Sequence, residues 1–149
     1  GITWMPIRCE IVSQDRQVFS GDVDIVILPG TAGQMGVLPH HTPLLTTLQY
    51  GIISVRAGKE EEHFTVAGGI AEIQPDQVTV LATASENILD IDVDRAQQAR
   101  KRADESLKNV AKLPKEQILA EQAALKRSDL RINAVRKYRP VKRYTSSHR

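Results

Sequence analysis

The sequence has few of the features that form disulfides, bind structural metals or insert into membranes. It contains a single cysteine, Cys9, which excludes an internal disulfide and any metal site that needs several cysteines. Its longest strictly aliphatic run, Ile25-Val26-Ile27-Leu28, is far shorter than the roughly 20 residues that a membrane-spanning helix needs. No basic segment followed by an apolar stretch opens the chain, so we expect neither a secretory signal nor direct membrane insertion.

Aromatic residues and glycines are also scarce or unevenly placed. Aromatic residues make up only 4% of the chain, which predicts an aliphatic core, and all nine glycines lie at or before Gly69. Charge divides in a similar way. Residues 1–90 carry 4 Lys or Arg against 11 Asp or Glu, a net charge of −7, whereas residues 91–149 carry 16 against 7, a net charge of +9. Composition therefore predicts two parts that meet near residue 90.

Residues 5–90 consist of short segments rich in Val, Ile and Thr, separated by Gly, Pro and Asp. Apolar and polar side chains alternate in several of them, and short turn sequences join neighbours, which predicts antiparallel hairpins. Many short strands at this spacing are typical of a sandwich or a barrel. The expected strands are 7–12, 17–20, 23–28, 36–38, 45–48, 51–56, 62–66, 69–74 and 77–81.

Residues 1–4 are interpreted as a remnant ahead of a natural start at Met5, or as a short native extension.

Residues 91–135 read as two helices, because the segment lacks glycine and is dominated by good helix formers. Asp92, or Asp90 just before it, is the expected N-cap of the first helix, and Pro114 separates the two. The apolar stripes consist of Ala96, Ala99, Ala103, Leu107 and Val110 on the first helix and of Ile118, Ala124, Leu125 and Ile132 on the second. A seam this thin predicts a weakly docked hairpin, suited to a switch. Residues 136–149 form a basic tail that we expect to be disordered until bound.

No catalytic or metal-binding pattern is evident. His40 and His41 are adjacent and would point to opposite faces of a strand, and no ligand spacing relates them to other residues. Cys9 lies in an apolar strand and is expected to be a buried structural thiol. The glycine-rich segment 30–36 lacks the lysine of a phosphate-binding loop and is expected to be a flexible tip. A cupin-like metalloenzyme is excluded because no His-x-His precedes a glutamate. The chain is therefore not expected to be an enzyme.

Arginines on the two expected helices are the strongest candidates for a ligand site. Asp92, Arg95 and Arg102 can share one helical face, and Arg127 and Arg131, four residues apart, share a face of the other helix. Planar guanidinium groups pair well with phosphate, so this pattern favours a polyanion. A solvated basic face is the simpler alternative. A free-standing module that grips nucleic acid or another acidic partner is a further alternative, although residues 91–135 carry no aromatic side chain for base stacking.

Four motifs occur in order along the chain: Gly36-x-Leu38-Pro39-x-His41-x-Pro43-Leu44-Leu45-Thr46-x-Leu48-x-x-Gly51, Val66-Ala67-Gly68-Gly69-Ile70-Ala71-Glu72-Ile73, Val78-Thr79-Val80-Leu81-Ala82 and Ile91-Asp92-x-x-Arg95-Ala96. Through them the chain resembles the epsilon subunits of bacterial F-type ATP synthases from about Met5 to Ile132. The resemblance implies a β-sandwich of about ten strands at 5–90, followed by a helical hairpin at 91–135. It also implies a non-catalytic rotor subunit of the central stalk, peripheral to the cytoplasmic face of the plasma membrane.

The resemblance also implies partners. The sandwich would bind the gamma subunit and sit on the ring of c subunits, and the extended hairpin would reach the alpha and beta subunits and block ATP hydrolysis. Many relatives carry glutamate where this chain has Gln34. The positions that match gamma and c-ring contacts are Gly30, Gln34, Gly36, Leu38, His41 and Pro43.

Some bacterial relatives bind ATP on the folded hairpin, as a regulatory ligand and not as a required cofactor. The resemblance therefore implies a regulatory ATP site in this chain. The matching positions are Glu86, Ile91, Asp92, Arg95, Ala96, Arg102, Arg127 and Arg131.

Overall fold

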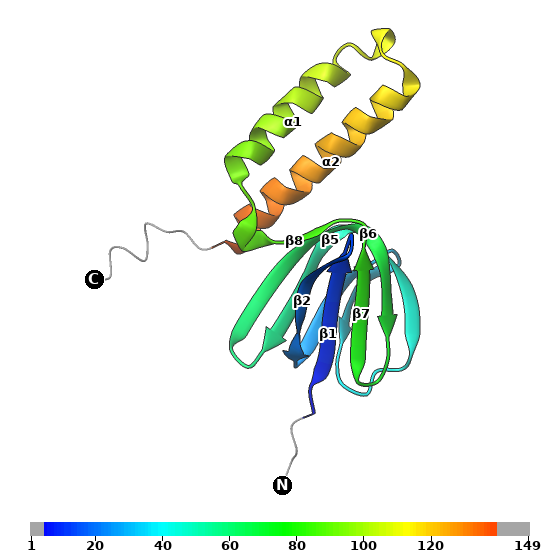
Figure 1. Cartoon of the computed structure of the whole chain (residues 1–149), viewed down its shortest axis with the longest axis vertical. Coiled ribbons are helices and arrows are strands. Elements are labelled where there is room, and N and C mark those ends of the chain that lie inside the picture. The colour runs from blue at the N-terminus through cyan, green and yellow to red at the C-terminus, as the bar shows by residue number, and fades with distance from the viewer. Residues whose placement is uncertain (1–4, 140–149) are drawn as a thin grey trace, which may run out of the picture. The chain divides into compact units, whose positions relative to one another are not determined.

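The computed structural model describes residues 5–139, which divide into two compact units, one ending at Asn87 and the other beginning at Ile88 (Figure 1). The first contains β1 (Ile7–Ser13), β2 (Arg16–Val23), β3 (Ile25–Gly30), β4 (Gly33–Val37), β5 (Leu44–Ala57), β6 (Glu60–Ile73), β7 (Gln77–Ala82) and β8 (Ser85–Asn87). The second contains the 3-10 turn η1 (Ile88–Asp90), α1 (Val93–Leu107), the 3-10 turn η2 (Val110–Lys112) and α2 (Lys115–Tyr138). The proposed remnant at 1–4 and most of the basic tail, 140–149, lie outside the described residues.

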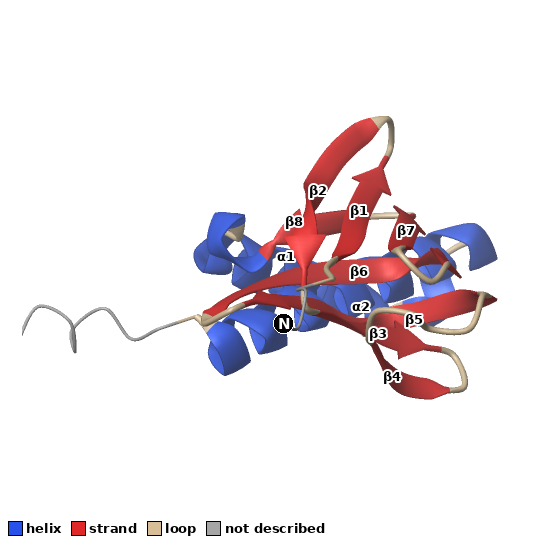
Figure 2. Ribbon diagram, turned by 90° about the horizontal axis from the view of Figure 1, so that it is seen from below, coloured by secondary structure: helices blue, strands red, loops and turns tan. Residues whose placement is uncertain are grey.

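The strands form one curled sheet in the order β2-β1-β7-β6-β5-β3-β4, with β8 paired to β6. Figure 2 shows β2 at one margin of the sheet and β4 at the other. A β-sandwich followed by two helices, as the sequence predicts, is confirmed. Pairing among the described strands is antiparallel except between β1 and β7, which run parallel. Parallel strands are not joined by a short hairpin turn, so no local sequence pattern predicts that β1 and β7 pair.

Residues 5–139 contain eight strands where about ten are expected, because β5 and β6 are continuous over 14 residues each. The sequence suggests breaks near Gly51 and Gly69, but both glycines lie inside strands. Residues 64–66 of β6 pair with β8, whereas residues 69–73 pair with β7, so the two halves of β6 have different neighbours. At the transition Gly68 and Gly69 adopt φ values of +85° and +142°. These conformations favour glycine, so the residues bend the strand instead of ending it.

The core of the first unit is aliphatic, as the composition predicts. Among the described residues, 5–87, Phe64 is the one aromatic side chain that is fully buried, and Phe19 packs beside it with the ring centroids 5.3 Å apart. Cys9 is fully buried in this core. Burial, with a smaller contribution from the neighbouring Glu10 carboxylate, raises the pKa of the Cys9 thiol to about 12. The expectation of a buried structural thiol is confirmed.

The helical unit begins at the predicted cap. The Asp92 carboxylate accepts a hydrogen bond from the backbone N–H of Arg95 at 3.1 Å, which satisfies a donor that the first turn of α1 leaves unpaired. The stripe expected to reach Val110 ends earlier, because α1 stops at Leu107 and Val110 lies in η2 with 43% of its surface exposed. Pro114 directly precedes α2, which continues past the expected end at residue 135 to Tyr138.

The seam between α1 and α2 is thin, as predicted. Ala96 and Ala103 are the buried residues of α1, and α2 buries Ser128, Ile132 and Ala134. The Ser128 hydroxyl donates to the Ala124 carbonyl at 2.9 Å, so its polar atom is satisfied within the helix. Ile132 is therefore the only large side chain buried by either helix in the described part of the chain.

Candidate functional site

The six expected partner-contact residues lie on two adjoining segments of the sandwich. Gly30, Gln34 and Gly36 belong to the β3–β4 hairpin, and Leu38, His41 and Pro43 belong to the connection from β4 to β5. Gly30 pairs directly with Gly33, so the expected flexible tip is a tight two-residue turn. The Thr31 and Thr47 hydroxyls, 2.7 Å apart, tie this turn to β5. The tip is thereby held in one position against the sheet.

Strand β4 presents one exposed face at the margin of the sheet. Met35 and Val37 turn inward, whereas Gln34 and Gly36 are exposed on the opposite side. Leu38, directly after the strand, is 57% exposed. A marginal strand also leaves backbone hydrogen-bonding groups unpaired on its outer side. Three of the six residues therefore share a surface that a partner chain could contact.

The connection between β4 and β5 is fixed by its own backbone. His40 has a φ of +68°, and its N–H donates to the Pro75 carbonyl at 2.7 Å. His41 is half-buried, and its Nδ1 lies 2.6 Å from the carbonyl oxygen of Thr42. Within residues 5–139, no group of three or more His, Cys, Asp or Glu side chains is placed to hold a metal ion. The His41 ring is thus oriented by a neighbouring carbonyl.

An exposed aliphatic row, defined as Leu45, Ile70 and Leu81, crosses three neighbouring strands. Ile70 of β6 is paired with Leu81 of β7 and with Thr47 of β5, and Leu45 lies two residues along β5 from Thr47. The three side chains are 66%, 38% and 50% exposed in the order given. The family motifs contain all three residues but do not by themselves predict an exposed row. The signal was available in the alternation, because Ile70 and Leu81 are apolar residues at the outward positions of their strands.

The eight residues of the expected ATP site fall in both units. Glu86 lies in β8 of the sandwich, where its backbone N–H donates to the Thr65 hydroxyl at 3.3 Å. The other residues lie in the helical unit. Ile91 and Ala96 are buried, Asp92 caps α1, and the arginines Arg95, Arg102, Arg127 and Arg131 are exposed.

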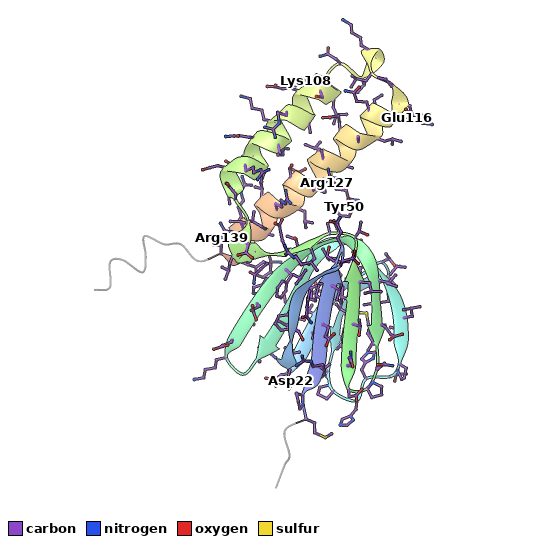
Figure 3. All side chains as sticks on the ribbon, viewed as in Figure 1. Asp22, Tyr50, Lys108, Glu116, Arg127 and Arg139 are labelled. Atoms are coloured by element: carbon purple, nitrogen blue, oxygen red, sulfur yellow. The ribbon has the colours of Figure 1, made fainter. Side chains whose placement is uncertain are left out.

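Those four residues form what we call the arginine face. Each directly precedes a buried residue of the seam: Ala96, Ala103, Ser128 and Ile132, respectively. Successive residues differ in direction by about 100° around the helix axis. Each of the four arginine side chains is therefore rotated by the same angle, in the same sense, from the buried side chain that follows it. Because the helices run antiparallel (Figures 1 and 3), equal rotations bring residues of both helices to the same side of the hairpin. The spacing predicts a shared face within each helix, and the structure brings the two pairs to one side of the hairpin.

The opposite side of the hairpin carries a polar groove of about 580 Å³. Its lining residues are Gln97, Arg100, Lys101, Asp104, Asp129, Ile132, Asn133 and Arg136. Arg100 of α1 donates from Nε to the Asp129 carboxylate of α2 at 2.5 Å, and this hydrogen bond raises the pKa of the Arg100 guanidinium. The groove is thus lined by both basic and acidic side chains, whereas the four residues of the arginine face are all basic.

These features define a protein with a β-sandwich, which offers an aliphatic row and an exposed marginal strand, followed by a helical hairpin with a basic face. The β-sandwich domain described for the ATP synthase delta/epsilon chain matches residues 6–88, and the long α-helix domain of the same chain matches residues 90–136. The chain belongs to the ATP synthase delta/epsilon chain family.

Relatives of this chain are bacterial ATP synthase epsilon chains. One from Dehalococcoides mccartyi is 41% identical over 134 residues, which cover 89% of this chain and 94% of the relative. One from Bordetella avium is 40% identical over 135 residues, which cover 90% and 94%. None of the helices in residues 5–139 combines the length and the hydropathy that crossing a bilayer requires.

Solved structures share the fold at low sequence identity. A chain of the Euglena gracilis mitochondrial ATP synthase, from an OSCP/F1/c-ring structure, matches with a TM-score of 0.75 at 20% identity, covering 91% of this chain and 84% of that one. A chain from the central stalk and c-ring of the Tetrahymena thermophila enzyme matches with a TM-score of 0.54 at 12% identity, covering 86% and 95%.

Proposed function

We propose that this chain is a non-catalytic rotor subunit of an ATP synthase, held in the central stalk by its sandwich. The observation that carries the proposal is the pairing of a sandwich and a helical hairpin within one family match, together with exposed contact surfaces on the sandwich. The matching Euglena and Tetrahymena chains come from structures of F1, central stalk and c-ring. On this proposal the chain is peripheral to the cytoplasmic face of the bacterial plasma membrane.

The sandwich would use two surfaces. The aliphatic row, Leu45, Ile70 and Leu81, suits the apolar centre of an interface, for which we propose the gamma subunit. The outer face of β4 and the segment after it, including Gln34 and His41, would contact the ring of c subunits. Gln34 cannot supply the negative charge that a glutamate would bring there. The proposed c-ring contact therefore depends on hydrogen bonding and shape at this position.

Binding to purified gamma subunit tests the first surface. A chain shortened to residues 5–90 retains the whole aliphatic core and should fold and bind gamma as the full chain does. Leu81→Asp should weaken binding about tenfold or more, because a charge at an apolar interface centre loses its solvation. Lys59→Asp, in the exposed turn between β5 and β6, is the matched control. A shortened chain that has a normal circular dichroism spectrum and yet does not bind gamma would contradict the assignment.

The hairpin would restrain ATP hydrolysis by extending toward acidic surfaces of the alpha and beta subunits. The net charge of +9 on residues 91–149 supports this role. Exposed ion pairs contribute only about 0–1 kcal/mol each and weaken with salt, so many must act together. Removal of residues 92–149 should raise the ATPase rate of the assembled complex, more at low than at moderate ionic strength. An unchanged rate under both conditions would exclude the inhibitory role.

ATP is the proposed ligand of the folded hairpin. Four guanidinium groups on one face repel one another, and a triphosphate would relieve that repulsion while pairing with them. Glu86 and Asp92 would lie near the base or ribose. A ligand that binds only the folded hairpin stabilises it by roughly 2.7 kcal/mol at a hundredfold excess over its Kd. ATP supply would then favour the folded, non-inhibitory form.

Calorimetry on the full chain tests this site. Arg95→Ala and Arg127→Ala should each weaken ATP binding, whereas Arg136→Ala, on the opposite side of the hairpin, should leave it unchanged. Asp92→Ser separates two roles of Asp92, because serine keeps the helix cap but removes the carboxylate. No heat at millimolar ATP, or equal affinity in all three arginine variants, would exclude the site.

A further inference from the structure

Arg139, at the end of α2, joins the two ends of the helical unit. One nitrogen of its guanidinium, Nη2, donates to the backbone carbonyls of Ile88 and of Ile91, the latter at 2.8 Å. The side chain is half-buried, and its Nε is buried without a hydrogen-bond partner among the described residues. Ile88 and Ile91 are themselves 2% and 4% exposed. The contact is therefore partly buried and joins residues about 50 positions apart in the sequence.

The position of this contact gives it a mechanical role. The chain itself connects α1 to α2 at one end of the hairpin, between the labelled Lys108 and Glu116 (Figure 3). At the other end, where α1 begins and α2 stops, the described chain has no covalent link, and Arg139 lies there. Its hydrogen bonds tie the last turn of α2 to the residues just before α1. Arg139 thus closes the open end of the hairpin.

The carbonyls that Arg139 holds adjoin the proposed nucleotide site. Ile91 directly precedes Asp92, whose carboxylate caps α1 through the N–H of Arg95. Fixing the Ile91 carbonyl therefore fixes the segment that sets the start of α1 and the direction of Arg95. Arg139 is not on the arginine face, because it lies beyond the last residue of α2 and its Nη2 is committed to backbone carbonyls.

We propose that Arg139 is a latch, a positioning residue that keeps the hairpin folded and so keeps the nucleotide site assembled. The effect of the latch on nucleotide binding rests on the proposed function, whereas its effect on the folding of the hairpin does not. Arginine suits this contact because Nη2 carries two N–H bonds fixed in the plane of the guanidinium, so it can donate to both carbonyls from one orientation. The lysine ammonium is instead a strongly hydrated point charge on a flexible stem. Opening of the hairpin separates Arg139 from Ile88 and Ile91, so loss of the latch shifts the population toward the open form.

A distance measurement on the full chain tests the latch without nucleotide. Spin labels on Gln97→Cys and Asn133→Cys, both in the polar groove, would lie close together in the folded hairpin. If the hairpin opens until its two helices lie end to end, the labels would be roughly 50 Å apart, from 1.5 Å per helical residue. Cys9 stays unlabelled because its thiol is buried. Arg139→Ala should raise the population at long distance about tenfold, as expected for loss of hydrogen bonds to a charged group.

Two further variants distinguish a latch from a general structural role. Arg139→Lys keeps the charge and should still open the hairpin, whereas Arg136→Ala, in the last turn of α2, should not. Oxidising the cysteines at 97 and 133 to a disulfide would hold the helices together, and this should restore in Arg139→Ala whatever ATP affinity the unmodified chain has. Unchanged distances in Arg139→Ala, or failure of the disulfide to restore a lost affinity, would overturn the latch. If the unmodified chain binds no ATP, the proposed nucleotide function fails and the distances alone decide.

Discussion

Replacing Ile132 by alanine should selectively destabilise the helical hairpin. Ile132 is 6% exposed, and the other residues that α1 and α2 bury are alanines and one serine. Truncating a buried isoleucine to alanine costs about 2–5 kcal/mol, and the lower part of that range applies where a two-helix seam can partly close. We therefore expect a loss of about 2–3 kcal/mol in the free energy that resists opening of the hairpin.

Amide hydrogen exchange read peptide by peptide measures this loss in the full chain. Each 1.4 kcal/mol corresponds to a factor of ten, so exchange in both α1 and α2 should accelerate by about 30-fold or more. Exchange in β6 should not change, because the sandwich has its own core. Leu119→Ala is the matched control, since Leu119 lies on α2 but is 56% exposed. Acceleration confined to α2, or an equal effect of Leu119→Ala, would refute the view that Ile132 holds the two helices together.

Three smaller predictions concern the sandwich. Gly69→Ala should destabilise the sandwich by more than about 3 kcal/mol in urea unfolding, because a Cβ at Gly69 would lie 2.3 Å from the Leu81 carbonyl oxygen and the φ there is +142°. Gly58 has a φ of +64° and open space around it, so Gly58→Ala should cost only about 1–2 kcal/mol. The Cys9 thiol should resist iodoacetamide at pH 8 until the protein is unfolded, since its pKa is raised to about 12, and modification at the rate of a free thiol would contradict the burial. Burial lowers the pKa of His63 below 6.5, against the opposing effect of Glu61, so the unfolded chain binds the proton more tightly. The free energy of unfolding should therefore fall as the pH drops below 6.5, and it should fall less in His63→Gln; an identical decline in both proteins would exclude this contribution.

Local signals in the sequence predict the helical unit well. Asp92 and Pro114 mark where the helices start because capping and proline geometry depend only on neighbouring residues. The seven-residue and four-residue spacings of the arginines predict that they share faces, and the buried residue after each arginine places both pairs on the same side of the hairpin.

Contacts between distant residues leave little local trace. Strand β8 has only three residues without an alternating pattern, and it exists because β6 provides a partner for it. The sequence predicts separate strands at 62–66 and 69–74 where β6 is continuous, because a bend and a turn use the same residue type. The contact of Arg139 with Ile91 spans 48 residues, and no spacing rule relates them. Such features depend on the finished packing and could not be read from the sequence.

The segment between the helices limits what an opened hairpin can become. Leu113 and Pro114 have extended ψ angles of 142° and 149°, and proline has no N–H to continue a helical hydrogen-bond ladder. α1 and α2 therefore cannot merge into one continuous rod when they separate. They behave as two rigid arms that meet at an elbow, and the dihedral angles of a few residues around Asn109 and Leu113 set the angle of that elbow. Which surface the second arm reaches is then decided by the direction of the elbow as well as by the length of the helices.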